Sequence, residues 1–200
     1  YPMIYMLSMS LRPWDEFADP LVIWLPRHVT LSNFAFALDL MNMPESFFLT
    51  LGISGVSSVL QIVSCAFAGY GFARFRFKFR GLMFALMLFT IIVPPQTYII
   101  PLYLQYRFFD FFGLGTVIGL LTGQKLSVNL LDTVYTFYLP AALGSGIRSG
   151  LFIYIYTQFF RGMPRELEDA AHIDGCGFMG TFVRVFVPNS VPAFLTVFFF

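Results

Sequence analysis

Four carboxylates lie close together in the stretch ELEDAAHIDGCGFMGTFVRVFVP, which covers residues 166–188 and also contains two adjacent alanines and three glycines. Carboxylates form strong, often bidentate pairs with arginine, and small alanine side chains let another backbone approach closely. These residue types at this spacing favour a contact surface for a protein partner. Most of the surrounding sequence is apolar, so the stretch differs sharply from its neighbours.

Two short helices joined by a turn are predicted for residues 164–188, which we call the acidic segment. Pro164 suits the first turn of a helix, where the acids that follow interact favourably with the helix dipole. Gly175 and Gly177 should end this helix, and a second one should run to Pro188. At about 100° per residue, one face of the first helix contains Leu167, Ala170 and Ala171. The opposite face, expected to make the contact, contains Arg165, Glu168, Asp169 and His172.

An amphipathic helix that lies on lipid would show a similar pattern. Such helices usually have lysine or arginine on the polar face, whereas this face is acidic and anionic headgroups would repel it. We therefore expect a protein partner for the acidic segment.

The composition of the whole chain indicates a membrane protein. Of its 200 residues, 58% are hydrophobic and 20% aromatic, while only 12% are charged, about half the usual share in soluble domains. The net charge of +1 comes without a clustered basic face, so no nucleic-acid partner is expected. The two cysteines, Cys65 and Cys176, indicate neither a disulfide framework nor a Cys/His metal site. No catalytic, cofactor or metal site is predicted.

Apolar runs long enough for membrane helices recur along the chain. About 20 apolar residues are needed to cross the hydrocarbon layer. The fold class expected is therefore all-α, a polytopic bundle of transmembrane helices in the lipid bilayer. Three complete spans are predicted, at residues 46–73, 81–106 and 133–160. Residues 1–11 and 189–200 are too short to span, and we expect them to be the end of a first helix and the start of the next in a longer protein. Pro94, Pro95 and Pro101 should bend the second span.

The positions of the cations predict which loops face the cytoplasm. Four of them lie in RFRFKFR at residues 74–80, and three more flank or lie within the acidic segment. The positive-inside rule places both regions in the cytoplasm, so that residues 12–45 and 107–132 face outward. The alternating Arg and Phe residues resemble a nucleic-acid patch, but cations that extend to a membrane interface explain them better.

Candidates for a substrate path lie in the third span. Arg148 falls near its middle, where a charge facing lipid is costly, so it should face protein or water. It could contact a solute or form an internal ion pair. Tyr154 and Tyr156 could stack on a sugar ring, or could anchor the span at the membrane interface.

The order of segments resembles that of importer permeases of the ATP-binding-cassette (ABC) type. DAAHIDG at 169–175, followed after nine residues by VFVP at 185–188, is similar to their signature, E-A-A, three residues, G, nine residues, I-x-L-P. The preceding QFFRGMPRELEDAA resembles the carbohydrate branch of the family, which contains the maltose-type permeases. GYGFARFRFKFRG at 69–81 and IVPPQTYIIPLYL at 92–104 also match the family pattern. The resemblance covers essentially the whole chain.

This resemblance implies a role for the acidic segment. In the family, the signature loop contains the cytoplasmic coupling helix, which docks on an ATPase subunit. The residues implied here are Glu168, Asp169, Ala170, Ala171, His172, Asp174 and Gly175. Asp169 replaces the usual glutamate, and either it or Glu168 would meet the ATPase. The chain has no G-x-x-x-x-G-K-[ST] loop, so ATP and magnesium are expected on the partner ATPase and no cofactor on this chain.

The function implied is that of a transport subunit and not of an enzyme. It would be part of a six-helix permease of the bacterial inner membrane that takes up a sugar or related polyol. The partners implied are two ATPase subunits, a second permease and an extracytoplasmic solute-binding protein, which residues 12–46 could touch. An amino-acid or peptide permease remains an alternative. An ion-coupled transporter would need intramembrane acids, which the three complete spans lack.

Overall fold

The computed structural model describes residues 2–17, 19, 24–110, 113, 115, 117, 119 and 127–200. No strand occurs among these residues, whose isolated bridge pairs Phe109 with Val128. The predicted all-α class is therefore confirmed. The chain divides into two units, Tyr1–Gly52 and Ile53–Phe200, which are described separately.

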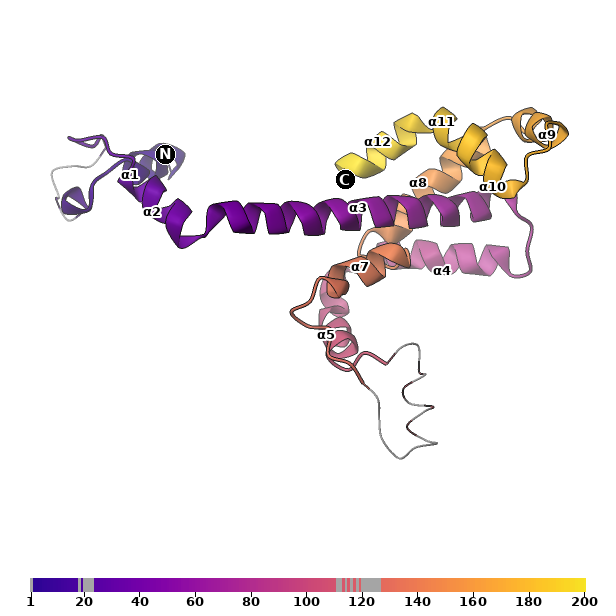
Figure 1. Cartoon of the computed structure of the whole chain (residues 1–200), viewed down its shortest axis with the longest axis horizontal. Coiled ribbons are helices and arrows are strands. Elements are labelled where there is room, and N and C mark those ends of the chain that lie inside the picture. The colour runs from indigo at the N-terminus through magenta and orange to yellow at the C-terminus, as the bar shows by residue number, and fades with distance from the viewer. Residues whose placement is uncertain are drawn as a thin grey trace. The chain divides into compact units, whose positions relative to one another are not determined.

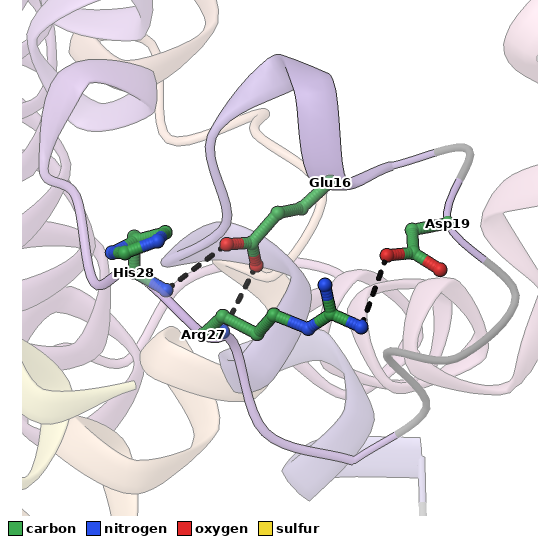
Figure 2. A network of polar contacts seen from close by, with 4 residues as sticks. All are labelled: Glu16, Asp19, Arg27 and His28. Atoms are coloured by element: carbon green, nitrogen blue, oxygen red, sulfur yellow. Dashed lines mark hydrogen bonds and ion pairs between the residues drawn. The ribbon is translucent and has the colours of Figure 1, made fainter.

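The first unit contains short helices and a buried carboxylate. Its elements are α1 (Pro2–Ser10), the 3₁₀ turn η1 (Trp14–Glu16), α2 (Ser32–Leu40) and the start of α3 (Met43–Arg74). Glu16 is buried, and its two carboxylate oxygens each accept a backbone N–H at 3.0 Å, from Arg27 and His28 (Figure 2). Arg27 also forms an ion pair with Asp19 at 3.3 Å. Glu16 thus satisfies two backbone donors that no helix or strand would pair.

The first predicted span, at residues 46–73, is a single helix within α3. By length and composition, α3 is the helix of the described chain that is long and apolar enough to cross a membrane. The pair Phe178–Asn189 and Val191–Phe199 passes the same test only if the two are taken together, and it is bent by 74°.

The second predicted span, at residues 81–106, is broken and not simply bent. Its parts are α4 (Arg80–Ile92), the 3₁₀ turn η2 (Pro95–Thr97) and α5 (Ile99–Arg107). Helix α4 ends at Ile92 because Val93 and Pro94 are both extended, as expected of residues that precede a proline. Pro101 lies in the first turn of α5, where proline costs no hydrogen bond.

The third predicted span, at residues 133–160, is also divided, into α7 (Tyr135–Ala142) and α8 (Ser149–Gly162). The break follows Pro140 and contains Gly144, whose φ of +61° lies in the left-handed region. Crossing of the membrane by the second and third spans stays a prediction. Most of residues 111–126, within the segment predicted to face outward, lie outside the described residues.

Five short helical elements make up the C-terminal part of the second unit. They are α9 (Glu166–Ile173), α10 (Phe178–Thr181), the π-helical turn η4 (Phe182–Phe186), α11 (Val187–Asn189) and α12 (Val191–Phe199). The predicted helix, turn and second helix of the acidic segment are therefore present, with the second helical stretch continuing one residue past Pro188. Figure 1 shows α9 and α10 at the C-terminal end of α3.

Helix α8 lies at the centre of the second unit (Figure 1). It packs against α4 and α12, and it crosses α3 at Gly69. A Cβ at Gly69 would lie 2.5 Å from the Tyr156 Cβ and 3.2 Å from the Thr157 backbone nitrogen. The Thr157 hydroxyl donates to the Ile153 carbonyl at 2.7 Å and lies 3.4 Å from that of Gly69. The absent side chain at position 69 therefore lets the two backbones meet.

Candidate functional site

The acidic segment begins with α9, as its sequence predicts. The backbone N–H groups of Glu168 and Asp169 donate to the Arg165 carbonyl at 2.9 and 3.0 Å and form the first turn. Three acids lie in that turn, Glu166, Glu168 and Asp169, where the partial positive charge of the helix N-terminus favours them.

The end of α9 is a Schellman turn centred on Gly175. Gly175 has a φ of +78°, its N–H donates to the His172 carbonyl at 3.1 Å, and the Cys176 N–H donates to the Ala171 carbonyl at 2.9 Å. The His172 Nδ1 lies 3.0 Å from the Cys176 carbonyl, a hydrogen bond that the Nδ1–H tautomer donates. Backbone and imidazole contacts thus fix the direction in which the chain leaves α9.

We predict that Gly175→Ala destabilises this turn by about 1–2 kcal/mol, because an L side chain disfavours the left-handed conformation. Gly177→Ala is the matched control, since Gly177 has a φ of −75° and a Cβ there would meet no atom within 4 Å. The rate of tryptic cleavage at Arg165 and Arg184 in membranes measures the effect. It should rise for Gly175→Ala and stay unchanged for Gly177→Ala. Equal rates in the two variants would contradict the assigned turn.

The two faces of α9 differ from the predicted ones at three residues, one of which is Leu167, predicted beside the buried Ala171 but exposed. Glu168 was placed on the contact face, but it is half-buried and pairs with Arg74 of α3, whose Nη1 lies 3.7 Å from its Oε2. Ala170 was placed with Ala171, yet Ala170 is exposed and Ala171 is buried. The inward face is set by contacts with α3, which a helical wheel does not contain. The exposed residues of α9 include Asp169, Ala170, His172 and Ile173.

The remainder of the acidic segment is anchored by aromatic rings. Phe182 and Phe186 are buried, and their ring centroids lie 5.0 and 4.9 Å from that of Tyr70 on α3. The ring of Phe160 on α8 lies 5.6 Å from that of Phe186. Phe178, at the start of α10, is exposed. These ring contacts connect the segment to both α3 and α8.

A cavity of about 630 Å³ lies elsewhere in the second unit. Arg148 lines it, together with residues of α3, α5, α7 and the turn before α8. Arg148 is the residue before the first turn of α8 and is exposed, so it lies at the helix break within the predicted third span. Its depth in the membrane stays a prediction. The cavity's polar lining includes Ser57, Ser58, Gln61, Tyr98, Tyr106, Thr136 and Ser145.

Tyr154 and Tyr156 are not among the residues that line this cavity. Tyr156 is fully buried, with its ring 5.8 Å from that of Phe160 and 4.9 Å from that of Phe194. Tyr154 lies beside Phe84 of α4, at 6.4 Å between ring centroids. Both rings pack between helices, and their place in a substrate path stays a prediction.

Sequence reasoning missed the cavity residues on α3. Ser57 and Gln61 are four residues apart, so they share a helix face. This polar pair within an otherwise apolar run was an available signal. Whether this helix face points into the bundle or toward lipid depends on the positions of the neighbouring helices.

The chain is similar to known permease proteins over most of its length. It is 31% identical to the osmoprotective compounds uptake permease protein of Synechocystis over 198 residues, which are 96% of this chain and 59% of that protein. It is 30% identical to the alpha-glucoside transport system permease protein of Rhizobium meliloti over 168 residues, 84% of this chain and 40% of that protein. The chain therefore spans less than two thirds of these curated relatives.

A solved structure has the same fold. A chain of a bacterial ABC transporter involved in the import of the acidic polysaccharide alginate superposes with a TM-score of 0.65 at 20% identity. The superposition covers all of this chain and 62% of that one.

A family model also matches residues 62–200 and so includes α8, most of the cavity lining and the whole acidic segment. The match extends over more than half of the sequence and confirms the resemblance drawn from the signature residues. The chain therefore belongs to the family of binding-protein-dependent transport system inner membrane components.

Proposed function

We propose that this chain is part of the permease subunit of an ATP-driven importer in a bacterial inner membrane, and that α9 docks on a cytoplasmic ATPase. The observation that carries this proposal is the two-sided build of α9. Its inner side faces the chain's own helices, with Glu168 paired to Arg74 of α3 and Ala171 buried. Its outer side exposes an acid, an alanine and Ile173, which is 86% exposed.

The outer side of α9 has the chemistry of a docking surface. Ala170 permits close approach, Asp169 offers a carboxylate to an arginine, and Ile173 adds apolar area. Phe178 and Met179, which follow the turn, are exposed as well. An exposed apolar patch with polar residues at its edge is typical of a surface that contacts another protein. The same family membership supports an extracytoplasmic solute-binding protein and a second permease as further partners.

ATP chemistry would belong to the partner. The sequence contains no phosphate-binding loop of the Walker type, so ATP and magnesium would bind the ATPase, two copies of which would serve a permease pair. This chain's contribution is mechanical: its docked helix would move when the ATPases close on ATP.

A cross-link from Cys176 tests the docking. Cys176 lies in the turn after α9 and is partly exposed, whereas Cys65 is fully buried and should react slowly. A photoactivatable thiol reagent is attached in native membranes, irradiated, and the adduct identified by mass spectrometry. We expect an ATPase with a Walker motif as the main adduct, lost in Asp169→Lys. Adducts only to lipid or to this chain would refute docking. Cys176→Ser is the control for labelling of Cys65.

We further propose that the transported solute is a sugar or related polyol. The carbohydrate named for the Rhizobium meliloti relative supports this class, as do the hydroxyl, amide and guanidinium groups within the mainly apolar lining of the cavity. Such groups can replace the hydrogen bonds that a polyhydroxylated solute loses on leaving water.

Gln61→Leu should lower uptake of the solute by about tenfold, because an apolar side chain leaves a solute hydroxyl unpaired at a cost of about 1–3 kcal/mol. Gln61 lines the cavity, and its Nε2 also donates to the Ser149 hydroxyl at 3.3 Å. Val59→Leu, on the same helix and not among the cavity-lining residues, is the control. Uptake of radiolabelled sugars into proteoliposomes measures the effect. Unchanged uptake by Gln61→Leu would remove the cavity from the transport path.

A further inference from the structure

The Arg74 side chain joins four separate segments of the second unit. It extends from the last residue of α3 and is only 5% exposed. Its Nη1 pairs with Glu168 of α9, and its Nη2 donates to the Met163 carbonyl at 2.7 Å. Its guanidinium carbon lies 4.8 Å from the centre of the Phe186 ring, in the π-helical turn.

Each of these contacts uses a different property of the guanidinium group. The planar fork presents two nitrogens at once, one to a carboxylate and one to a carbonyl, while its flat face lies over an aromatic ring. Met163 directly follows α8, whose C-terminal carbonyls have partial negative charge that favours a cation. A lysine could make one of these contacts, but it could not contact the carboxylate, the carbonyl and the ring at the same time.

Arg74 differs in this respect from the neighbouring cations of the RFRFKFR loop. Arg76 and Lys78 are exposed, as expected for cations at a membrane interface. The buried Arg74 requires a partner, because an unpaired guanidinium removed from water is costly. Glu168 supplies that partner, and it is thereby turned away from the exposed side of α9. Asp169, the next residue, is about 100° around the helix and remains exposed.

We propose that Arg74 and Glu168 are a positioning pair that makes α9 move together with α3 and α8, while Asp169 is the acid that meets the ATPase. The proposal rests on the proposed function and adds to it that the two adjacent acids have different roles. Without the pair, α9 could still dock, but its displacement would be transmitted less completely to the helices that line the cavity. The pair would therefore set the number of solute molecules moved per ATP hydrolysed.

The test measures ATPase association and transport per ATP separately, in the complete transporter in proteoliposomes. Glu168→Gln keeps the shape of the side chain and removes its charge. We expect it to retain the ATPase and to lower transport per ATP on the order of tenfold, a usual size for coupling between sites. Asp169→Asn should instead weaken ATPase association. Arg76→Ala is the matched control and should change neither quantity.

Exchanging the charges of Arg74 and Glu168 tests whether the pair positions α9 or only stabilises the fold. Arg74→Glu and Glu168→Arg should each uncouple transport, and the double variant should recover part of the lost coupling. Full recovery is not expected, because the exchanged arginine no longer reaches the Met163 carbonyl. Arg74→Lys should give a transport per ATP between that of the wild type and that of Arg74→Glu. If Arg74 variants fail to accumulate in the membrane, Glu168→Gln and Glu168→Arg still decide the outcome.

Two results would overturn the positioning pair while leaving the proposed function intact. One is wild-type transport per ATP in Glu168→Gln. The other is a loss of ATPase association in Glu168→Gln as large as that in Asp169→Asn, which would place Glu168 on the docking face. Failure of the wild-type chain to associate with any ATPase would instead refute the proposed function itself.

Discussion

Ala170→Trp is expected to lower solute uptake strongly while leaving α9 folded. Ala170 is exposed on the outer side of α9, so an indole there would point away from the packed interior of this chain. A partner that approaches closely would be pushed away, and overpacking of about 1–3 kcal/mol corresponds to roughly 5- to 150-fold weaker association.

ATPase retained by the purified permease and uptake by the same preparation measure this prediction. Ala142→Trp is the matched control, because Ala142 is an exposed alanine at the end of α7 and outside the acidic segment. It should retain the ATPase at the wild-type level. Normal ATPase retention by Ala170→Trp would mean that another surface makes the contact.

Gly69→Val should give the largest loss of stability of any single change considered. The new Cβ would lie 2.5 Å from that of Tyr156, 3.2 Å from the Thr157 nitrogen and 3.3 Å from the Ile153 carbonyl oxygen. The last two are backbone atoms, which no rotamer change can move. Helices α3 and α8 must therefore separate, at a cost of about 3 kcal/mol, the upper part of the usual range for overpacking.

Gly71→Val provides the comparison, since a Cβ at Gly71 of the same helix would meet nothing within 4 Å. Both variants place a β-branched residue in α3, so they share any loss of helix propensity. The midpoint of thermal unfolding in detergent should fall for Gly69→Val and change little for Gly71→Val. Similar midpoints would show that the two helices do not meet at Gly69.

The elements that the sequence predicted well are those with local signals. Pro164, the acids that follow it and Gly175 each act through their own backbone, so α9 and its turn could be located before any packing was known. The all-α class followed from composition in the same way. The proline pair at 94–95 predicted a disturbance, although the chain leaves the helix entirely at this point.

The features that sequence reasoning missed depend on tertiary contacts. The division between α7 and α8 occurs at Gly144, in a run whose average hydropathy is high enough to suggest one helix. The inward orientation of Glu168 depends on Arg74, which is far away in sequence and which the sequence pattern groups with the other interface cations of residues 74–80. A helical wheel gives relative directions around α9 but not which direction faces α3.

One consequence follows from α3 being a single helix between Arg74 and the cavity. Ser57 lies about 26 Å along the axis from Arg74, at 1.5 Å per residue. A tilt of about 7° at the Arg74 end would displace Ser57 by about 3 Å, which is the length of a hydrogen bond. The helix would thus serve as a lever: a small rotation of α3 at its Arg74 end would become a displacement near Ser57 large enough to break or form a solute's hydrogen bonds.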